Sequence, residues 1–216
     1  MKTFKLSPSS LNLMHDCTRC FWLEKHKVWK RPAGIFPSLP SGMDGILKTH
    51  FDKFRDRGLL PPELCNNSHC ADLKLFNEPE LMKSWRNNLK GIRWEDKDGN
   101  SLFGAVDNIL VKGSKLVVLD YKTRGYAVKE DTAEHYQNQL DIYNFLLRKN
   151  GYQTEDYAFL LFYVPKEVME TGEVIFDTEL VKMKIEVRNA ENIWKEAIDL
   201  LNKDCPAKAC EWCEGK

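Results

Sequence analysis

Apolar residues recur at helical spacing through the first 90 residues of the chain. Residues 7–10 (SPSS) form a helix start signal, and the apolar pattern from Leu11 predicts a helix that continues to about Lys27. Further helices are predicted over about 42–57 and 78–89. A Pro- and Gly-rich loop is predicted at 31–41, and the prolines at 61–62 end the second helix. The first part of the chain is therefore expected to be mainly helical.

The pattern changes from helical to extended near residue 91. Segments rich in Val, Ile, Leu, Phe and Tyr predict five strands, and two segments of helical spacing follow the third and the fifth. The strands are expected over 91–96, 101–111, 115–122, 156–164 and 174–187, and the helices over 131–149 and 190–202. This order predicts an α/β fold with a central mixed sheet flanked by helices. We expect one domain over 1–216, with a helical part at 1–90, a sheet core at 91–187 and a C-terminal helix with a cysteine segment at 188–216.

Composition narrows the class of protein. The chain has 216 residues, of which 43% are hydrophobic and 11% aromatic, which excludes a disordered chain. No apolar run approaches the ~18 residues of a membrane span. The 32 basic and 32 acidic residues cancel, so a nucleic-acid partner would need a local basic patch. The first residues lack a secretory signal, and we expect a cytoplasmic protein.

Two CxxC pairs lie at opposite ends of the chain. Cys17 and Cys20 form the first pair, with the spacing i, i+3 on one face of the predicted helix, and Cys210 and Cys213 form the second. Four thiolates suit zinc or an iron–sulfur cluster, and such a site would join the two termini. Cys205 is a possible substitute ligand. The alternative is that these cysteines are small buried hydrophobes or a redox pair.

A further pair, Cys65 and Cys70, has only His69 beside it. Two or three ligands are too few for a closed metal site, so we interpret these as loop residues without one.

A hairpin between the second and third predicted strands sets up an acidic pair. A two-residue turn at Gly113-Ser114 would pair Lys112 with Lys115. Counting outward from this turn places Asp107 opposite Asp120 on the same face of the sheet. Like charges in this position repel, so a Mg²⁺ or Mn²⁺ ion between them is expected. The alternative is a solvated strand end with Lys122 as an ion-pair partner.

Lys122 lies two residues after Asp120, on the same face of its strand. Two carboxylates, a divalent cation and a lysine form a set that can hydrolyse a phosphodiester. The cation lowers the pKa of the attacking water, and the lysine orients this water or stabilises the charge that develops on phosphate.

These residues carry a family resemblance. The segments 104–107 (GAVD) and 118–123 (VLDYKT) resemble the core of the PD-(D/E)xK nucleases, in particular the RecB-type branch that includes the AddB nuclease domain and the CRISPR-adaptation exonucleases. The segment 139–143 (QLDIY) resembles the Q-x-x-x-Y motif of that branch. The terminal cysteines resemble those of its iron–sulfur members. The resemblance spans nearly the whole chain and implies a restriction-endonuclease-like core.

The resemblance also implies roles for residues. Asp107, Asp120 and the carbonyl of Tyr121 would bind Mg²⁺ or Mn²⁺, Lys122 would be the catalytic lysine, and Gln139 and Tyr143 would support the site or the substrate. Lys122 and Arg124 are the candidates for phosphate contact.

The implied activity is that of a DNA nuclease, expected to be an exonuclease acting on free or single-stranded ends, with a possible protein partner in DNA processing. The implied cluster is [4Fe-4S], with Zn²⁺ as the alternative. The alternative function is a non-catalytic nucleic-acid-binding or assembly module that keeps the nuclease fold.

Two features depart from the pattern of the family. Its members usually have a histidine in an early helix; His50 is the candidate here, but its spacing from Gly45 is one residue longer than expected, and Asp44 could take its place. The family usually has one N-terminal and three C-terminal cysteines, so the fourth ligand could be Cys20 or Cys205.

The basic run 25–31 contains one aromatic residue, Trp29, which could stack on a base. The interpretation that we prefer is a solvated helix end with one buried aromatic.

Overall fold

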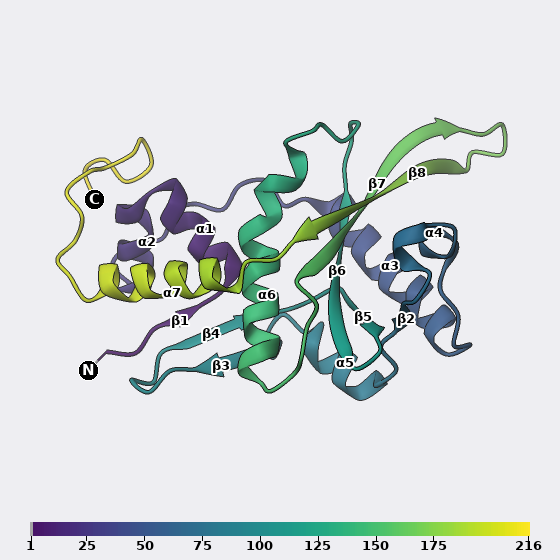
Figure 1. Cartoon of the computed structure of the whole chain (residues 1–216). Coiled ribbons are helices and arrows are strands. Elements are labelled where there is room, and N and C mark those ends of the chain that lie inside the picture. Colours follow the sequence, from purple (N-terminus) through teal and green to yellow (C-terminus); the bar gives the residue numbers. More distant parts are fainter. Residues whose placement is uncertain (1) are drawn as a thin grey trace.

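A computed structural model describes residues 2–216 and contains a five-stranded mixed sheet (Figure 1). The strand order is β2-β5-β6-β7-β8, in which only β6 and β7 run parallel. The strands are β2 (Lys74–Leu75), β5 (Asn108–Lys112), β6 (Lys115–Thr123), β7 (Tyr157–Val168) and β8 (Val174–Lys184). The expected α/β fold with a mixed sheet flanked by helices is confirmed.

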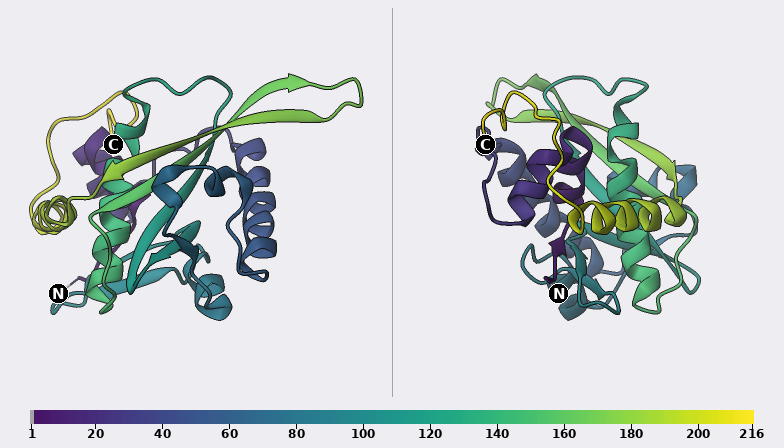
Figure 2. Two further views of the ribbon diagram at one scale, coloured as in Figure 1. Left: turned by 45° about the vertical axis from the view of Figure 1, so that its right-hand side comes forward. Right: turned by 90° about the vertical axis from the view of Figure 1, so that its left-hand side faces the viewer.

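The central strand β6 is buried on both faces because apolar residues fill both of its alternating sets. Leu116 and Val118 belong to the core beneath helix α6 (Gln137–Lys149), whereas Val117 and Leu119 belong to the core beneath helix α3 (Ser38–Arg55). The sheet is therefore the middle layer between two helices (Figure 2). The carboxyl end of β6 emerges between them.

The predicted strand 101–111 is wrong as a single strand. It is divided into β4 (Ser101–Gly104) and β5, which belong to different sheets: β4 forms a small sheet with β1 (Lys5–Leu6) and β3 (Ile92–Glu95). The chain passes from one sheet to the other through the fully buried Val106. Gly104 lies so close to α6 that a Cβ atom there would be 2.7 Å from the Tyr143 ring. Packing of this segment against α6 thus takes it out of the large sheet.

The predicted N-terminal helix is also divided. Helix α1 (Pro8–Asp16) ends at Cys17, whose extended backbone (φ −161°, ψ 112°) makes it the N-cap of α2 (Thr18–Lys25). Cys17 and Cys20 therefore do not share one continuous helix. The Cys17 sulfur instead accepts a hydrogen bond from the Cys20 amide, at 3.5 Å.

Most other predicted elements occur with shifted ends. Helix α3 begins within the segment predicted as a loop, and the first turn of the helix predicted at 131–149 is the 3₁₀ segment η2 (Thr132–Tyr136). The remaining helices are α5 (Pro79–Trp85), α7 (Val187–Leu201) and two short elements that were not predicted, α4 (Pro62–Cys65) and η1 (Ser68–Cys70). Among the helices of residues 2–216, none combines the length and the apolar character needed to cross a membrane.

The hairpin of β7 and β8 extends beyond the rest of the sheet (Figure 1). Pairing of β6 with β7 ends at Thr123 and Tyr163, whereas β7 and β8 stay paired as far as Val168 and Val174. The outer part of the hairpin is thus a two-stranded ribbon next to the carboxyl end of β6.

Candidate functional site

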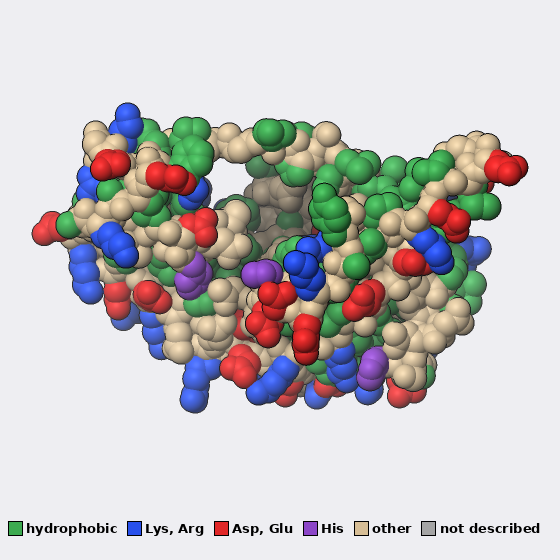
Figure 3. Space-filling view, turned by 90° about the horizontal axis from the view of Figure 1, so that it is seen from above, with side chains coloured by type: hydrophobic (Ala, Val, Ile, Leu, Met, Phe, Trp, Pro, Cys, Tyr) green, Lys and Arg blue, Asp and Glu red, His purple; other side chains and the backbone are tan. Residues whose placement is uncertain are grey.

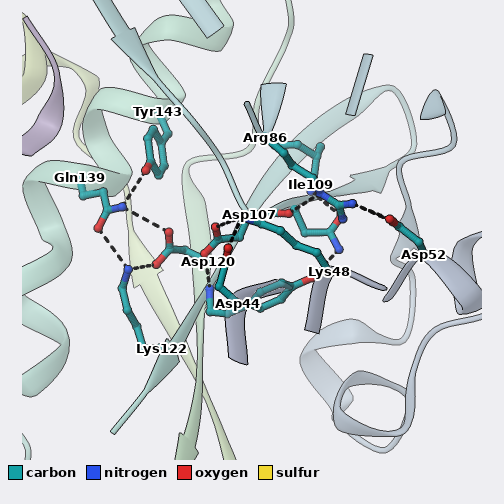
Figure 4. Close-up of polar contacts among 12 residues, drawn as sticks. Asp44, Lys48, Asp52, Arg86, Asp107, Ile109, Asp120, Lys122, Gln139 and Tyr143 are labelled. Atoms are coloured by element: carbon teal, nitrogen blue, oxygen red, sulfur yellow. Dashed lines mark hydrogen bonds and ion pairs between the residues drawn. The ribbon is translucent and has the colours of Figure 1, made fainter. Parts of the chain in front are cut away.

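An acidic pair forms where β5 begins. The predicted register is confirmed, because Val111 pairs with Leu116 and Leu110 with Val117. The ladder ends at Asn108, so Asp107 lies in a bend just outside the strand. Its Oδ2 accepts a hydrogen bond from the Tyr121 amide at 2.9 Å, which fixes the carboxylate at the open edge of β6 beside Asp120 (Figure 4).

A polar network holds the Asp120 side chain on the other side of this edge (Figure 4). Asp120 is 1% exposed and forms an ion pair with the Lys122 ammonium. Gln139 accepts a hydrogen bond from Lys122 Nζ at 3.3 Å and donates one to Asp120 Oδ1 at 3.3 Å. Gln139 also donates to the Tyr143 hydroxyl at 2.7 Å. The structure thus brings together four of the residues singled out from the sequence.

Burial makes this carboxylate a proton acceptor near neutral pH. The pKa of Asp120 is raised to about 7, mainly by desolvation and also by the charge of Asp107, while Lys122 opposes the change. Burial lowers the pKa of Lys122, but Asp120, Asp107 and Tyr136 together raise it more, so the ammonium stays charged. The site therefore contains the charged Lys122 ammonium beside the Asp120 carboxylate, whose ionisation is disfavoured by burial.

Helix α3 adds two charged residues, of which sequence reasoning missed one. Lys48 Nζ lies 2.7 Å from Asp44 Oδ2 and 3.2 Å from Asp107 Oδ1. Burial raises the pKa of Asp44, and the nearby Asp107 carboxylate adds to this, while Lys48 opposes it. The i, i+4 spacing of Asp44 and Lys48 was the available sequence signal, since it puts both side chains on one helix face.

Two arginines, Arg55 buried and Arg86 partly buried, fix the backbone of the acidic segment. Arg86 Nε donates to the Asp107 carbonyl at 2.7 Å, and Arg86 Nη1 bonds both carboxylate oxygens of Asp52 at 2.8 Å. Arg55 Nη2 donates to Asn108 Oδ1 at 2.6 Å. Bidentate and charge-assisted contacts of this kind are directional, so they restrain the bend that presents Asp107.

His50 is not brought to this network. Its Nε2 atom lies 3.0 Å from Glu63 Oε1, and its ring contacts Phe54. The turn of 100° per residue puts His50 about 200° from Lys48 around α3, so its side chain leaves the helix on the other side. Asp44 is therefore the candidate of this early helix that reaches the acidic pair.

The oxygen donors at the edge of β6 fit a divalent cation. Asp120 Oδ2 is buried and, apart from its ion pair with Lys122, has no hydrogen-bond partner within residues 2–216. The N–H and C=O groups of one strand residue point to the same edge, so the Tyr121 carbonyl faces the gap that Asp107 occupies. Carboxylate and carbonyl oxygens are the ligands that Mg²⁺ and Mn²⁺ prefer.

The four cysteines of the two CxxC pairs converge. Their sulfur atoms all lie within 4.8 Å of one another. Individual distances are 3.9 Å for Cys17–Cys213, 3.5 Å for Cys20–Cys210 and 3.7 Å for Cys210–Cys213. The C-terminal segment thus lies against α2 (Figures 1 and 2), and the expected joining of the termini by a candidate metal site is confirmed.

The environment of these thiols differs from one to the next. Burial raises the pKa of Cys20, and hydrogen bonds among the sulfurs add to this. Burial also raises the pKa of Cys210, but hydrogen bonds from the backbone of Trp212 and from Cys20 lower it to about 6. A bound cation would favour the thiolate form of all four, and their protons would be released to solvent when it binds.

Cys205 and Trp29 border this cluster. Arg19 Nη1 lies 3.4 Å from the Cys205 sulfur and donates to the Pro206 carbonyl at 2.8 Å, which holds the C-terminal segment beside α2. Trp29 packs against the same group of cysteines. The aromatic residue of the basic run is therefore partly buried rather than presented to a nucleic acid.

Comparisons with known proteins agree with the resemblance seen in the sequence. A family model described as the PD-(D/E)XK nuclease superfamily matches residues 5–215. No curated protein matches the chain. The family match covers the acidic edge, the helix that carries Gln139 and both cysteine pairs.

Proposed function

The chain belongs to the PD-(D/E)XK nuclease superfamily, and from this premise we propose that it is a Mg²⁺- or Mn²⁺-dependent nuclease that hydrolyses phosphodiester bonds in DNA. The observation that carries the proposal is the buried Asp120–Lys122 ion pair beside Asp107 at the open edge of β6. The alternative interpretation, a surface ion pair at a solvated strand end, predicts exposed side chains, whereas this carboxylate is buried and its lysine is partly buried. The finer assignment is an exonuclease that acts on free or single-stranded ends in the cytoplasm, alone or with a protein partner.

Each residue of the site has a role in this proposal. Asp107, Asp120 and the Tyr121 carbonyl hold the cation, which when bound lowers the pKa of a water and offsets charge on the phosphate. Lys122 orients the attacking water or stabilises the negative charge that develops on the phosphate oxygens. Gln139 forms hydrogen bonds with both Lys122 and Asp120 and so fixes their relative position. The Tyr143 hydroxyl accepts a hydrogen bond from Gln139 and positions its side chain. Arg124, just beyond the strand, contacts a substrate phosphate.

The alternative function is a binding module without turnover. It predicts that DNA binds and stays intact. The position of Lys122 argues against it, because an ammonium placed between a buried carboxylate and Gln139 is a costly arrangement for a protein that only binds.

Replacing Lys122 with Gln is expected to lower the rate of DNA cleavage about a hundredfold while Mn²⁺ still binds, because the charge that stabilises the transition state is lost but the carboxylates remain. Cleavage of end-labelled DNA and calorimetric titration with Mn²⁺ measure the two effects. Lys115→Gln is the matched control, since Lys115 lies at the other end of β6 in an exposed ion pair with Glu155. Equal loss in both variants would contradict the role of Lys122.

We also propose that Asp44 is the residue of the early helix that supports the cation site, in place of His50. Asp44→Asn is then expected to weaken Mn²⁺ binding by about tenfold, the lower range for outer ligand partners. His50→Gln should leave it unchanged, because His50 faces Glu63. Titration calorimetry on both variants decides between them: weaker binding in His50→Gln alone would assign the role to His50.

The four cysteines are proposed to hold a resident metal that joins the termini. Four ligands of one Zn²⁺ ion at ~2.3 Å lie about 3.8 Å apart, close to the sulfur separations found here. A [4Fe-4S] cluster binds each thiolate to a different iron and needs a wider spacing, so the geometry favours zinc. The absorption spectrum of anaerobically purified protein tests this choice, because a cluster absorbs visible light and zinc does not.

A further inference from the structure

An apolar cavity of about 400 Å³ adjoins the acidic site, and of the residues that line it the proposed chemistry uses only Arg124. Its volume lies in the range of ligand-binding cavities, about 300–1,000 Å³. Three parts of the chain line it: the start of α3, the end of β6 and the projecting hairpin. Its walls include Leu39, Met43, Thr123, Arg124, Pro165 and Phe176.

The cavity is a direct neighbour of the site. Met43 precedes Asp44 in α3, and Thr123 follows Lys122 in β6. Side chains alternate along a strand, so Thr123 points to the α3 side of the sheet, where Asp44 and Lys48 also lie. Viewed from this end, hydrophobic side chains gather between the charged centre of the face and the β7–β8 hairpin (Figure 3).

We propose that this cavity binds one unstacked nucleobase of a single-stranded substrate, next to the phosphate that is cleaved. The proposal rests on the proposed nuclease function and adds a subsite to it. A base offers a flat apolar face, which fits walls made of Phe176, Pro165 and Leu39. Arg124 is the one charged residue among the residues that line the cavity, and its positive charge suits the phosphate attached to that base.

The surroundings favour the same occupant. Leu39 at the rim is 67% exposed, and Tyr126, two residues beyond Arg124, is 83% exposed. Exposed apolar and aromatic residues beside a cation are the elements of a platform on which bases stack. Bases of a duplex are paired and stacked, so they cannot enter the cavity without being pulled out of the helix. The subsite would therefore select single strands.

The experiment uses labelled single-stranded DNA in which one abasic nucleotide is moved along the strand. Binding is measured by fluorescence anisotropy without divalent cations, and cleavage is measured separately with Mn²⁺. An abasic nucleotide at one position is expected to weaken binding about tenfold, because one base loses its stacking contacts. Leu39→Ser should remove this dependence on position, so that intact and abasic strands bind alike.

The control is Ile46→Ser, because Ile46 lies in the same helix and is 65% exposed but is not among the residues that line the cavity. It should behave as the wild type does. Binding that is the same for every abasic position, or lost equally in both serine variants, would overturn the subsite and leave the nuclease proposal standing if cleavage occurs. Position-dependent binding without cleavage would support the subsite and refute the nuclease.

Discussion

Replacing Asp120 with Asn is expected to lower metal-dependent DNA cleavage by about a thousandfold, the upper range for loss of one preorganised charged group. The amide keeps the shape of the side chain but removes the charge that would hold the cation. Because Asp120 is buried and faces Asp107, no neighbouring carboxylate can replace it without moving the strand. End-labelled DNA and Mn²⁺ provide the measurement, with Asp177→Asn, an exposed change on the hairpin, as the control.

The same variant has an expected effect on stability that separates chemistry from folding. The pKa of Asp120 is about 7 in the folded protein, above its ordinary value of 3.8, so the folded state binds more protons than the unfolded state. In metal-free buffer this residue therefore lowers the free energy of unfolding as pH rises from about 4 through 7. Asp120→Asn lacks this loss, so the difference in the free energy of unfolding between variant and wild type should shift in favour of the variant as pH rises from about 4 to 8. A difference that stays constant over this range, or shifts in favour of the wild type, would contradict this account of the site.

Replacing Cys20 with Ser is expected to release the metal and to lower the free energy of unfolding by several kcal/mol. Binding of a metal in structural thiolate sites contributes roughly 10 kcal/mol or more to the stability of the folded state. The expected loss is smaller here, because the hydrophobic core still stabilises the fold when the metal is absent. Cys20 is a fully buried residue of α2, and its sulfur lies 3.5 Å from that of Cys210 in the C-terminal segment. Thermal unfolding and metal content by elemental analysis measure the two effects.

Cys65→Ser is the matched control, because Cys65 is exposed in α4 and is not one of the four clustered cysteines. It should retain both the metal and the stability of the wild type. If Cys20→Ser kept its metal, Cys205 would be the substitute ligand. If neither variant contained metal and both unfolded as the wild type does, the cysteines would be buried hydrophobes and no metal would join the termini.

The sequence was most informative where local patterns determine structure. The two-residue turn at Gly113 was enough to fix the register of the hairpin, because it pairs Lys112 with Lys115 and the other pairs follow by counting outward. The spacing of Asp120 and Lys122 then placed both groups on one face, where the structure finds them in contact.

Features that depend on distant packing could not be predicted in this way. The break at Val106 arises because the preceding segment packs against Tyr143 of α6, a contact between segments far apart in the sequence. Lys48 and Arg86 contact Asp107 from other elements of the fold. Their distance from Asp107 in the sequence gives no sign of these contacts. The extended backbone of Cys17 is likewise part of a site that forms only when the C-terminal segment returns to α2.

Incubation of end-labelled single- and double-stranded DNA with the wild type and Asp120→Asn, with and without Mg²⁺ or Mn²⁺, tests the central claim most directly. The account predicts that the wild type shortens DNA only when a divalent cation is present, and that Asp120→Asn does not shorten it measurably. DNA that stays intact with the metal-loaded wild type, or that both proteins cleave equally, would contradict the claim.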